Sequence, residues 1–293
     1  VMTDASPTGS DPATNSGSPA DRSWHEIAAQ WPADNVAIAV VNSGGIVESF
    51  GDLDRRFRLA SVTKPLVATA IWLAVEEGAL TPDTPAGPPG STVRHLLCHA
   101  SGVGPDDDTI LAAPGTRRIY SNHGFALLAQ ALEAHASMTV EHYLHDGVLE
   151  PLAMSATSFD GPPGSGAVGS ARDLATWVMS MLNPGTLLDS STIAEATTVQ
   201  FADIDGVLPG YGTQRPNPWG LGVEIRGHKS PHWTGSLNSP ETYGHFGQTG
   251  TFVWIDPVRS LGLVGLGDLD FGNWALPLWP VLSDSVIRTF GGT

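Results

Sequence analysis

Strand-like segments occur near both ends of this 293-residue chain and are scarce in its middle, which strongly limits how it can fold. Near the start, residues 36–42 and 46–51 are rich in β-branched residues and flank Ser43-Gly44-Gly45, a pattern that predicts a β-hairpin. Three similar runs near the end are separated by turns: 221–225, 251–256 and 261–266. We therefore expect one antiparallel sheet built from both ends of the chain.

The middle of the chain combines helical periodicity with loops rich in Gly and Pro. A helix is predicted after Ser61, with Gly78 as its stop. Further helices are expected at 24–31, 91–98, 122–136, 140–147, 172–182, 190–199 and 276–290. The predicted fold class is α+β, an α/β sandwich in which helices flank the antiparallel sheet and an all-helical domain is inserted.

The expected domain organisation is a single unit over 23–293. Its sheet subdomain covers about 23–80 and 205–293, and its helical subdomain covers about 81–204. Residues 1–22 are Ser, Thr, Pro, Gly and Asp with little to bury, so we expect them to form a disordered leader.

The charge balance narrows the classes of partner. Lys and Arg number 14 against 30 Asp and Glu, a formal charge of −16, which argues against nucleic acid or an anionic membrane. No apolar run is long enough to span a bilayer, and no secretory signal is visible, so a cytoplasmic location is expected unless a signal has been removed. The single cysteine, Cys98, excludes an intrachain disulfide and is expected in the core.

The first candidate catalytic pair is Ser61 and Lys64, spaced S-x-x-K at the start of the buried helix that follows Ser61. A serine hydroxyl is a weak nucleophile until a neighbouring base removes its proton. Burial and the positive end of the helix dipole both favour a neutral lysine, which can act as that base. Taken alone, this short motif is more often a serine that caps a helix.

Two further groups stand at loop boundaries. Tyr120 and Asn122 precede a predicted helix, where a phenol can relay protons and an amide can hold a substrate carbonyl, although Ser121 or Asn122 could merely cap that helix. His245 and Gly247 precede the predicted strand 251–256, where glycine permits close approach of a ligand to the backbone. A histidine in such a place is by itself more often an ordinary surface or core residue.

The order S-x-x-K, Y-S-N, H-x-G, with a helical region between the first and third motifs, resembles the penicillin-recognising serine hydrolases. This superfamily includes class C β-lactamases, D-alanyl-D-alanine carboxypeptidases, D-aminopeptidases and esterase relatives. Further similar segments are 57–64, 92–102, 114–116, 151–154 and 169–174. The resemblance covers about 36–290.

The resemblance implies a role for each motif residue. Ser61 would be the acylated nucleophile, Lys64 its base, and Tyr120 the group that passes a proton to the leaving group and helps to activate water. Asn122 would orient the substrate carbonyl or amide.

The third motif would bind substrate and the oxyanion. His245 and Gly247 would take the places of the first and last residues of the K-T-G motif found in many relatives. The oxyanion hole would be formed by the backbone N–H groups of Ser61 and Gln248.

Two departures from the family pattern indicate which of the family's activities to expect. Phe246 replaces the usual Thr or Ser, and His245 replaces a lysine with a fixed positive charge, so we expect weak or absent β-lactamase activity. The favoured function is therefore an esterase-type serine hydrolase of small acyl esters. The alternatives are a D-amino-acid-specific peptidase, a weak β-lactamase and a non-catalytic binding relative.

The expected partner is a small ester, amide or short D-amino-acid peptide, and the oligomeric state stays open. Two histidine pairs spaced by four residues, His95 with His99 and His228 with His232, could share a metal. Because neither pair has an acidic third ligand in a recognisable motif, no metal and no cofactor are expected.

Overall fold

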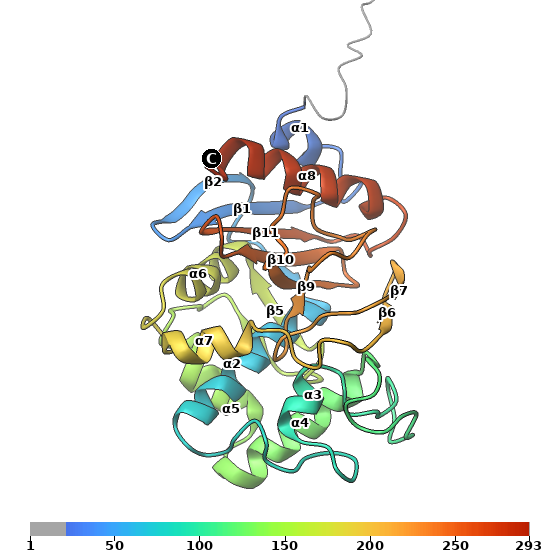
Figure 1. The fold of residues 1–293 in the computed structure, drawn as a ribbon. Helices are drawn as coiled ribbons and strands as arrows, with labels where there is room; N and C mark the ends of the chain where they lie inside the picture. The colour runs from blue at the N-terminus through green and yellow to red at the C-terminus, as the bar shows by residue number, and fades with distance from the viewer. Residues whose placement is uncertain (1–21, 293) are drawn as a thin grey trace, which may run out of the picture.

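The computed structural model describes residues 22–292, so the predicted leader lies almost wholly outside the described residues. Its main feature is a six-stranded antiparallel sheet in the order β2-β1-β11-β10-β9-β8 (Figure 1). The strands are β1 Val36–Asn42, β2 Gly45–Gly51, β8 Glu224–Ile225, β9 Tyr243–Gly247, β10 Thr251–Asp256 and β11 Leu261–Gly267. Strand β1 pairs with β11 from Val36 opposite Gly267 to Asn42 opposite Leu261, which confirms a sheet built from both ends.

Two strands differ from the expectation. Residues 243–247 were expected to lead into a strand but form β9 itself, because Gly244 and Gly247 weaken the strand signal of a segment that is buried throughout. Strand β8 is shorter than the predicted 221–225, since Gly222 takes a left-handed φ of 88° that breaks the extended chain.

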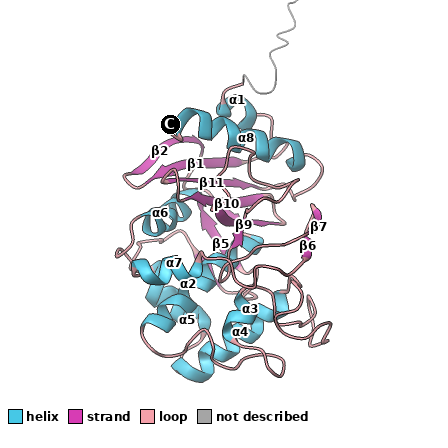
Figure 2. Ribbon diagram, viewed as in Figure 1, coloured by secondary structure: helices cyan, strands magenta, loops and turns pink. Residues whose placement is uncertain are grey.

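Helices cover both faces of the sheet (Figure 2). The C-terminal helix α8, Ala275–Phe290, and the short α1, Trp24–Ala28, pack on one face, and α6, Ala171–Leu182, packs on the other. Alternation along β1 explains the two layers: Ile38 and Val40 join the core under α8, while Ala37, Ala39 and Val41 join the core that contains α6.

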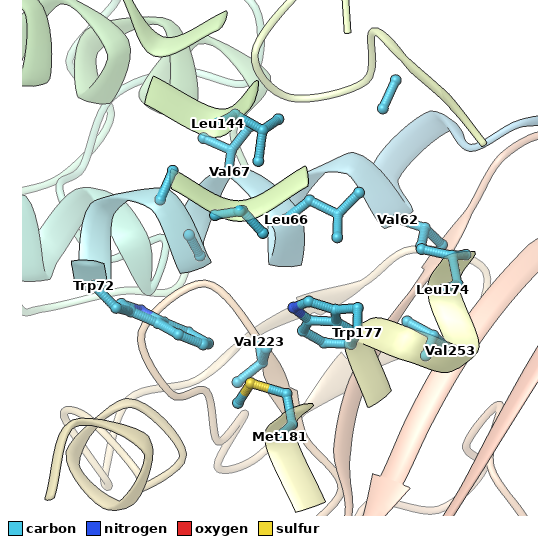
Figure 3. Close-up of a cluster of buried hydrophobic side chains, with 14 of the residues drawn as sticks. Val62, Leu66, Val67, Trp72, Leu144, Leu174, Trp177, Met181, Val223 and Val253 are labelled. Atoms are coloured by element: carbon cyan, nitrogen blue, oxygen red, sulfur yellow. The ribbon is translucent and has the colours of Figure 1, made fainter. Parts of the chain in front are cut away.

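The helical part is organised around α2, Thr63–Glu76, which is buried on nearly every side. Around it lie α3 Val93–Leu97, α4 Asn122–Ala136, α5 Val140–Leu144 with a π-helix at His145–Leu149, and α7 Ser190–Ala196. Figure 3 shows part of this core, including Leu66 of α2, Trp177 of α6 and Val253 of β10. None of the described helices is both long enough and apolar enough to cross a membrane.

The inserted region also contains strands, where the sequence predicts only helix and loop. Strands β4, Ser158–Phe159, and β5, Ala167–Ser170, join β3, Arg56–Arg58, in a small sheet of order β3-β5-β4. A Cβ at Gly169 would lie 2.8 Å from the Thr157 hydroxyl, so this strand requires a glycine that conceals its strand character in the sequence. A separate hairpin is formed by β6, Gly206–Leu208, and β7, Gly212–Gln214.

Candidate active site

Ser61 lies in a single 3₁₀ turn, Ala60–Val62, between β3 and α2. This turn is fixed on both sides: Leu59 N–H donates to Ala167 O at 3.0 Å, and the Thr251 hydroxyl donates to Leu59 O at 2.9 Å. Ala60 has a left-handed φ of 45°, which directs the chain sharply into the helix. The residue that caps α2 is Val62, without a side-chain hydrogen bond, so the Ser61 hydroxyl is not used as a cap.

Lys64, one turn along, is fully buried behind Ser61. Its Nζ donates to Asn122 Oδ1 at 2.7 Å and to Gly164 O at 2.8 Å, and it lies 3.3 Å from Ser61 Oγ. Burial lowers the pKa of Lys64 to about 7, against a smaller opposing effect of Asp106. A neutral amine has two N–H bonds for the two short contacts, which leaves its lone pair for the Ser61 proton.

Tyr120 also contacts Ser61: its hydroxyl donates to Ser61 Oγ at 2.7 Å, and its ring centroid lies 4.6 Å from Lys64 Nζ. Burial, strengthened by Glu224 and partly offset by the bond to Ser61, raises the pKa of Tyr120, so the phenol keeps its proton. Ser121 caps α4 by accepting from Gly124 N–H at 2.8 Å. The capping interpretation is therefore correct for Ser121, and it leaves Tyr120 and Asn122 available on either side.

Asn122 holds Lys64. Its Oδ1 accepts from the lysine, and its Nδ2 donates to Asp106 Oδ1 at 3.2 Å, which fixes the amide orientation. The direct partner of Asn122 in this structure is thus Lys64, and Asn122 also lines the cavity in front of Ser61.

His245 on β9 is buried and neutral. Burial and the nearby Lys64 lower the pKa of His245 to about 3. Its Nδ1 lies 2.7 Å from Phe246 O, which can only accept, so Nδ1 carries the proton and Nε2 is an acceptor 3.5 Å from the Tyr120 hydroxyl. His245 therefore does not supply a fixed positive charge.

Gly247 and Gln248 have different positions relative to the cavity. A Cβ at Gly247 would lie 2.5 Å from both Leu59 O and Thr251 Oγ1, so glycine is required for β9 to pack against the Ser61 turn. Gln248 lines the cavity, whereas Gly247 does not. The close packing brings the backbone of β9 beside the turn that holds Ser61.

A cavity of about 210 Å³ opens in front of Ser61. It brings together residues from the three predicted motifs with others from the late loops and strands: Ser61, Tyr120, Asn122, Leu208, Pro209, Trp219, Glu224, His245, Phe246 and Gln248. Glu224 was not identified from the sequence, because it lies in an apolar strand-like run without any motif.

His99 is a second residue whose role in the site was not identified from the sequence. It is buried at a left-handed φ of 58°, and its ring lies 4.6 Å from the ring of Tyr120. Its Nδ1 accepts from Ser121 N–H at 3.2 Å, so His99 holds both the ring of Tyr120 and the backbone that follows it. The only available signal was its place in the family-like segment 92–102.

The two histidine pairs spaced by four residues have different surroundings. His95 bonds to Thr92 and His99 to Ser121, while His232 bonds to Glu224 and His228 is exposed. Within 22–292, the one group of three ligand-type residues close enough to share an ion is His145, Asp146 and Glu150, all exposed. Neither histidine pair belongs to this group.

A serine contacted by a buried lysine and a tyrosine, between an antiparallel sheet and a helical region, defines a β-lactamase and transpeptidase-like fold. The chain belongs to the Beta-lactamase family, whose model matches residues 26–276. It is a hydrolase of this serine β-lactamase family.

Individual relatives differ in their names. The chain is 52% identical to a β-lactamase from Mycobacterium bovis, with a TM-score of 0.90 over 92% of this chain and 100% of that one. EstCE1, a hydrolase with promiscuous acyltransferase activity, is 18% identical with a TM-score of 0.74, covering 90% of this chain and 97% of that one, and shares the fold. A putative D-alanyl-D-alanine carboxypeptidase of Salmonella typhi is 25% identical over 53% of this chain and 46% of its own length, so the chain spans about half of that curated relative.

Proposed function

We propose that this protein hydrolyses small acyl esters through an acyl-enzyme formed on Ser61. The observation that carries the proposal is the position of Ser61 Oγ, 2.7 Å from the Tyr120 hydroxyl and 3.3 Å from Lys64 Nζ. One group can remove the serine proton and the other can protonate a leaving group, which together are the requirements of acyl transfer.

In the first half of the reaction, neutral Lys64 takes the Ser61 proton as Oγ bonds to the ester carbonyl carbon. We assign stabilisation of the resulting oxyanion to the backbone N–H groups of Ser61 and Gln248; each such donor contributes about 3 kcal/mol to transition-state stability. Tyr120 protonates the departing alkoxide and is left as a phenolate beside the Lys64 ammonium.

In the second half, water attacks the acyl-enzyme and gives a proton to the Tyr120 phenolate. The Ser61 oxygen leaves the carbonyl carbon and recovers its proton from Lys64. The acid is released, both catalytic groups return to their starting protonation states, and the net reaction consumes one water for each ester.

The walls of the cavity disfavour acyl groups that carry a carboxylate. His245 is neutral and presents an acceptor, and Phe246 has no hydroxyl with which to bind a carboxylate. A volume of about 210 Å³ favours a short acyl chain.

A second candidate is hydrolysis of D-amino-acid peptides. It is favoured by the curated relatives named as putative D-alanyl-D-alanine carboxypeptidases. The same acylation steps apply to an amide, with Tyr120 protonating the departing amine. A third candidate is weak β-lactamase activity, which is favoured by the name of the Mycobacterium bovis relative.

The test is steady-state hydrolysis of p-nitrophenyl butyrate, nitrocefin and a D-alanyl p-nitroanilide by the wild type, by Ser61→Ala and by Ser155→Ala. Ser155 is exposed and far from the motifs in sequence, so it controls for loss of a hydroxyl. We expect ester turnover that Ser61→Ala abolishes and Ser155→Ala preserves. Turnover that survives Ser61→Ala would reject the mechanism, and the ratio among substrates decides the branch.

A further inference from the structure

The catalytic cavity has a buried carboxylate in its wall. Glu224 on β8 is 2% exposed, and its Oε1 accepts from Lys229 Nζ at 2.5 Å and His232 Nε2 at 2.8 Å. Its Oε2 accepts from Trp233 Nε1 at 2.5 Å. Burial alone raises the pKa of Glu224, but Lys229 and His232 outweigh it and bring the pKa below its usual range, so the carboxylate is ionised.

The two partners of the ion pair lie against different cavities. Glu224 lines that cavity, whereas Lys229 lines a different, larger cavity of about 750 Å³. The lysine is held there by two further acceptors, Asn217 Oδ1 and Pro218 O, both at 3.1 Å. Of the two charged residues, Glu224 is therefore the one that borders the cavity in front of Ser61.

In the described part of the chain, no lysine or arginine lines this cavity to offset the negative charge of Glu224. Glu224 is the one residue with a formal charge among those that line the cavity, since His245 is neutral. A second carboxylate, that of Asp106, binds Asn122, which is another of the lining residues. The rings of Trp219 and Phe246 also line the cavity, and aromatic faces attract cations.

One buried hydroxyl behind this wall has no partner among the described residues. The Tyr211 hydroxyl is buried and has no hydrogen-bond partner within residues 22–292. Its ring lies 6.1 Å from Phe246 and 6.5 Å from His232, a partner of Glu224. Buried hydroxyls normally have partners, because leaving one unpaired costs about 1–3 kcal/mol.

We propose that Glu224 is a specificity residue that makes the cavity select acyl substrates carrying an ammonium or another N–H donor and reject those carrying a carboxylate there. The inference rests on the proposed function, because such a substrate must react at Ser61. The class of substrate it identifies is a small ester or amide with a cationic group close to the reacting carbonyl.

The test uses three phenylboronic acids that differ only in the 3-substituent: aminomethyl, carbamoyl and carboxyl. Boron accepts an electron pair from Ser61 Oγ, whose proton passes to Lys64, so each compound forms a tetrahedral adduct without a leaving group. Inhibition constants are measured against p-nitrophenyl butyrate hydrolysis. The variants are Glu224→Gln, which leaves Lys229 unpaired, and Glu224→Gln/Lys229→Met, which removes the pair with no change in net charge.

For the wild type we expect the aminomethyl compound to bind at least ~10-fold more tightly than the carboxyl compound, a difference of about 1.4 kcal/mol. The double variant is expected to reduce this ratio toward one, and Glu224→Gln to reverse it. A wild-type ratio near one would overturn the proposal even if no variant folds. An unchanged ratio in a folded double variant would also overturn it. Failure of all three boronic acids, together with no Ser61-dependent hydrolysis, would instead reject the proposed function.

Discussion

Two buried lysines each contact residues that line the cavity in front of Ser61, and their surroundings differ. The polar partners of Lys64 are neutral oxygens of Ser61, Asn122 and Gly164, and its Nζ also lies over the rings of Tyr120 and Phe125. Lys229 instead contacts the Glu224 carboxylate. Burial lowers the pKa of Lys64 to about 7 and that of Lys229 to about 8, with Glu224 limiting the second decrease. The lysine without a carboxylate partner can release its proton to do chemistry, and the paired lysine holds charge in place.

The largest expected effect that follows from this difference is on activity. Lys64→Met keeps a buried chain of similar length but removes the base, so kcat/KM for p-nitrophenyl butyrate should fall by about 10³-fold. The melting temperature should stay near that of the wild type or rise, because a buried amine is lost. A Lys64→Met enzyme with more than about a tenth of wild-type activity would show that Lys64 is not the base.

The matching substitution of the second lysine, Lys229, should change the stability of the fold. Lys229→Met leaves the Glu224 carboxylate buried without its cation, which should lower the free energy of unfolding by about 3–5 kcal/mol in urea denaturation. Adding Glu224→Gln should restore much of that loss. If Lys229→Met is no less stable than the wild type, the Glu224–Lys229 pair is not a buried ion pair of the kind described.

The pH dependence of activity separates the two lysines again. The active form requires neutral Lys64, so kcat/KM should rise about tenfold per pH unit below the Lys64 pKa of about 7 and then level off. Lys229 should not contribute a further rise near its own pKa of about 8. A profile that is flat or falls from about pH 5 to pH 7 would contradict the assignment.

The lowered pKa of Lys64 in the folded state also predicts how the stability of the protein changes with pH. Lys64 binds fewer protons in the folded state than in the unfolded state between its folded pKa of about 7 and its unfolded value of 10.5. Wild-type stability measured relative to Lys64→Met should therefore increase with pH across this window, by about 1.4 kcal/mol per unit at most. Parallel urea denaturation of the two proteins at several pH values measures it, and a difference independent of pH would mean an unperturbed lysine.

The smallest expected effect concerns how Tyr120 is held in place. His99→Ala removes the ring packed on Tyr120 and the acceptor for Ser121 N–H, so kcat should fall by about tenfold with little change in KM. His95→Ala is the control, because His95 lies four residues earlier, on α3, and contacts Thr92 and Phe201 instead. Equal losses in both variants would reduce His99 to a general packing role.

The residues around Ser61 could be found in the sequence because they lie in short motifs at loop–helix junctions. Ser61 and Lys64 are three residues apart where a 3₁₀ turn enters α2, and Tyr120 and Asn122 flank a helix cap, so local spacing carries much of their geometry. The main sheet was also predictable from β-branched runs at the two ends.

The cluster of Glu224, Lys229 and His232 could not be predicted in the same way. Glu224, Lys229 and His232 meet only because the loop after β8 folds back on it, and nothing in their spacing requires that turn. Strands β5 and β9 were hidden by the glycines that their close packing requires. The pairing of a charge and the approach of two backbones are tertiary effects that local propensity does not encode.

The most direct test of the account is the intact mass of the protein after rapid acid quenching with p-nitrophenyl acetate, for the wild type, Ser61→Ala and Lys64→Met. We predict that the wild type gains one acetyl group, that Ser61→Ala gains none, and that Lys64→Met gains it far more slowly. The absence of an adduct during active turnover by the wild type, or an equal adduct in Ser61→Ala, would contradict acyl transfer through Ser61.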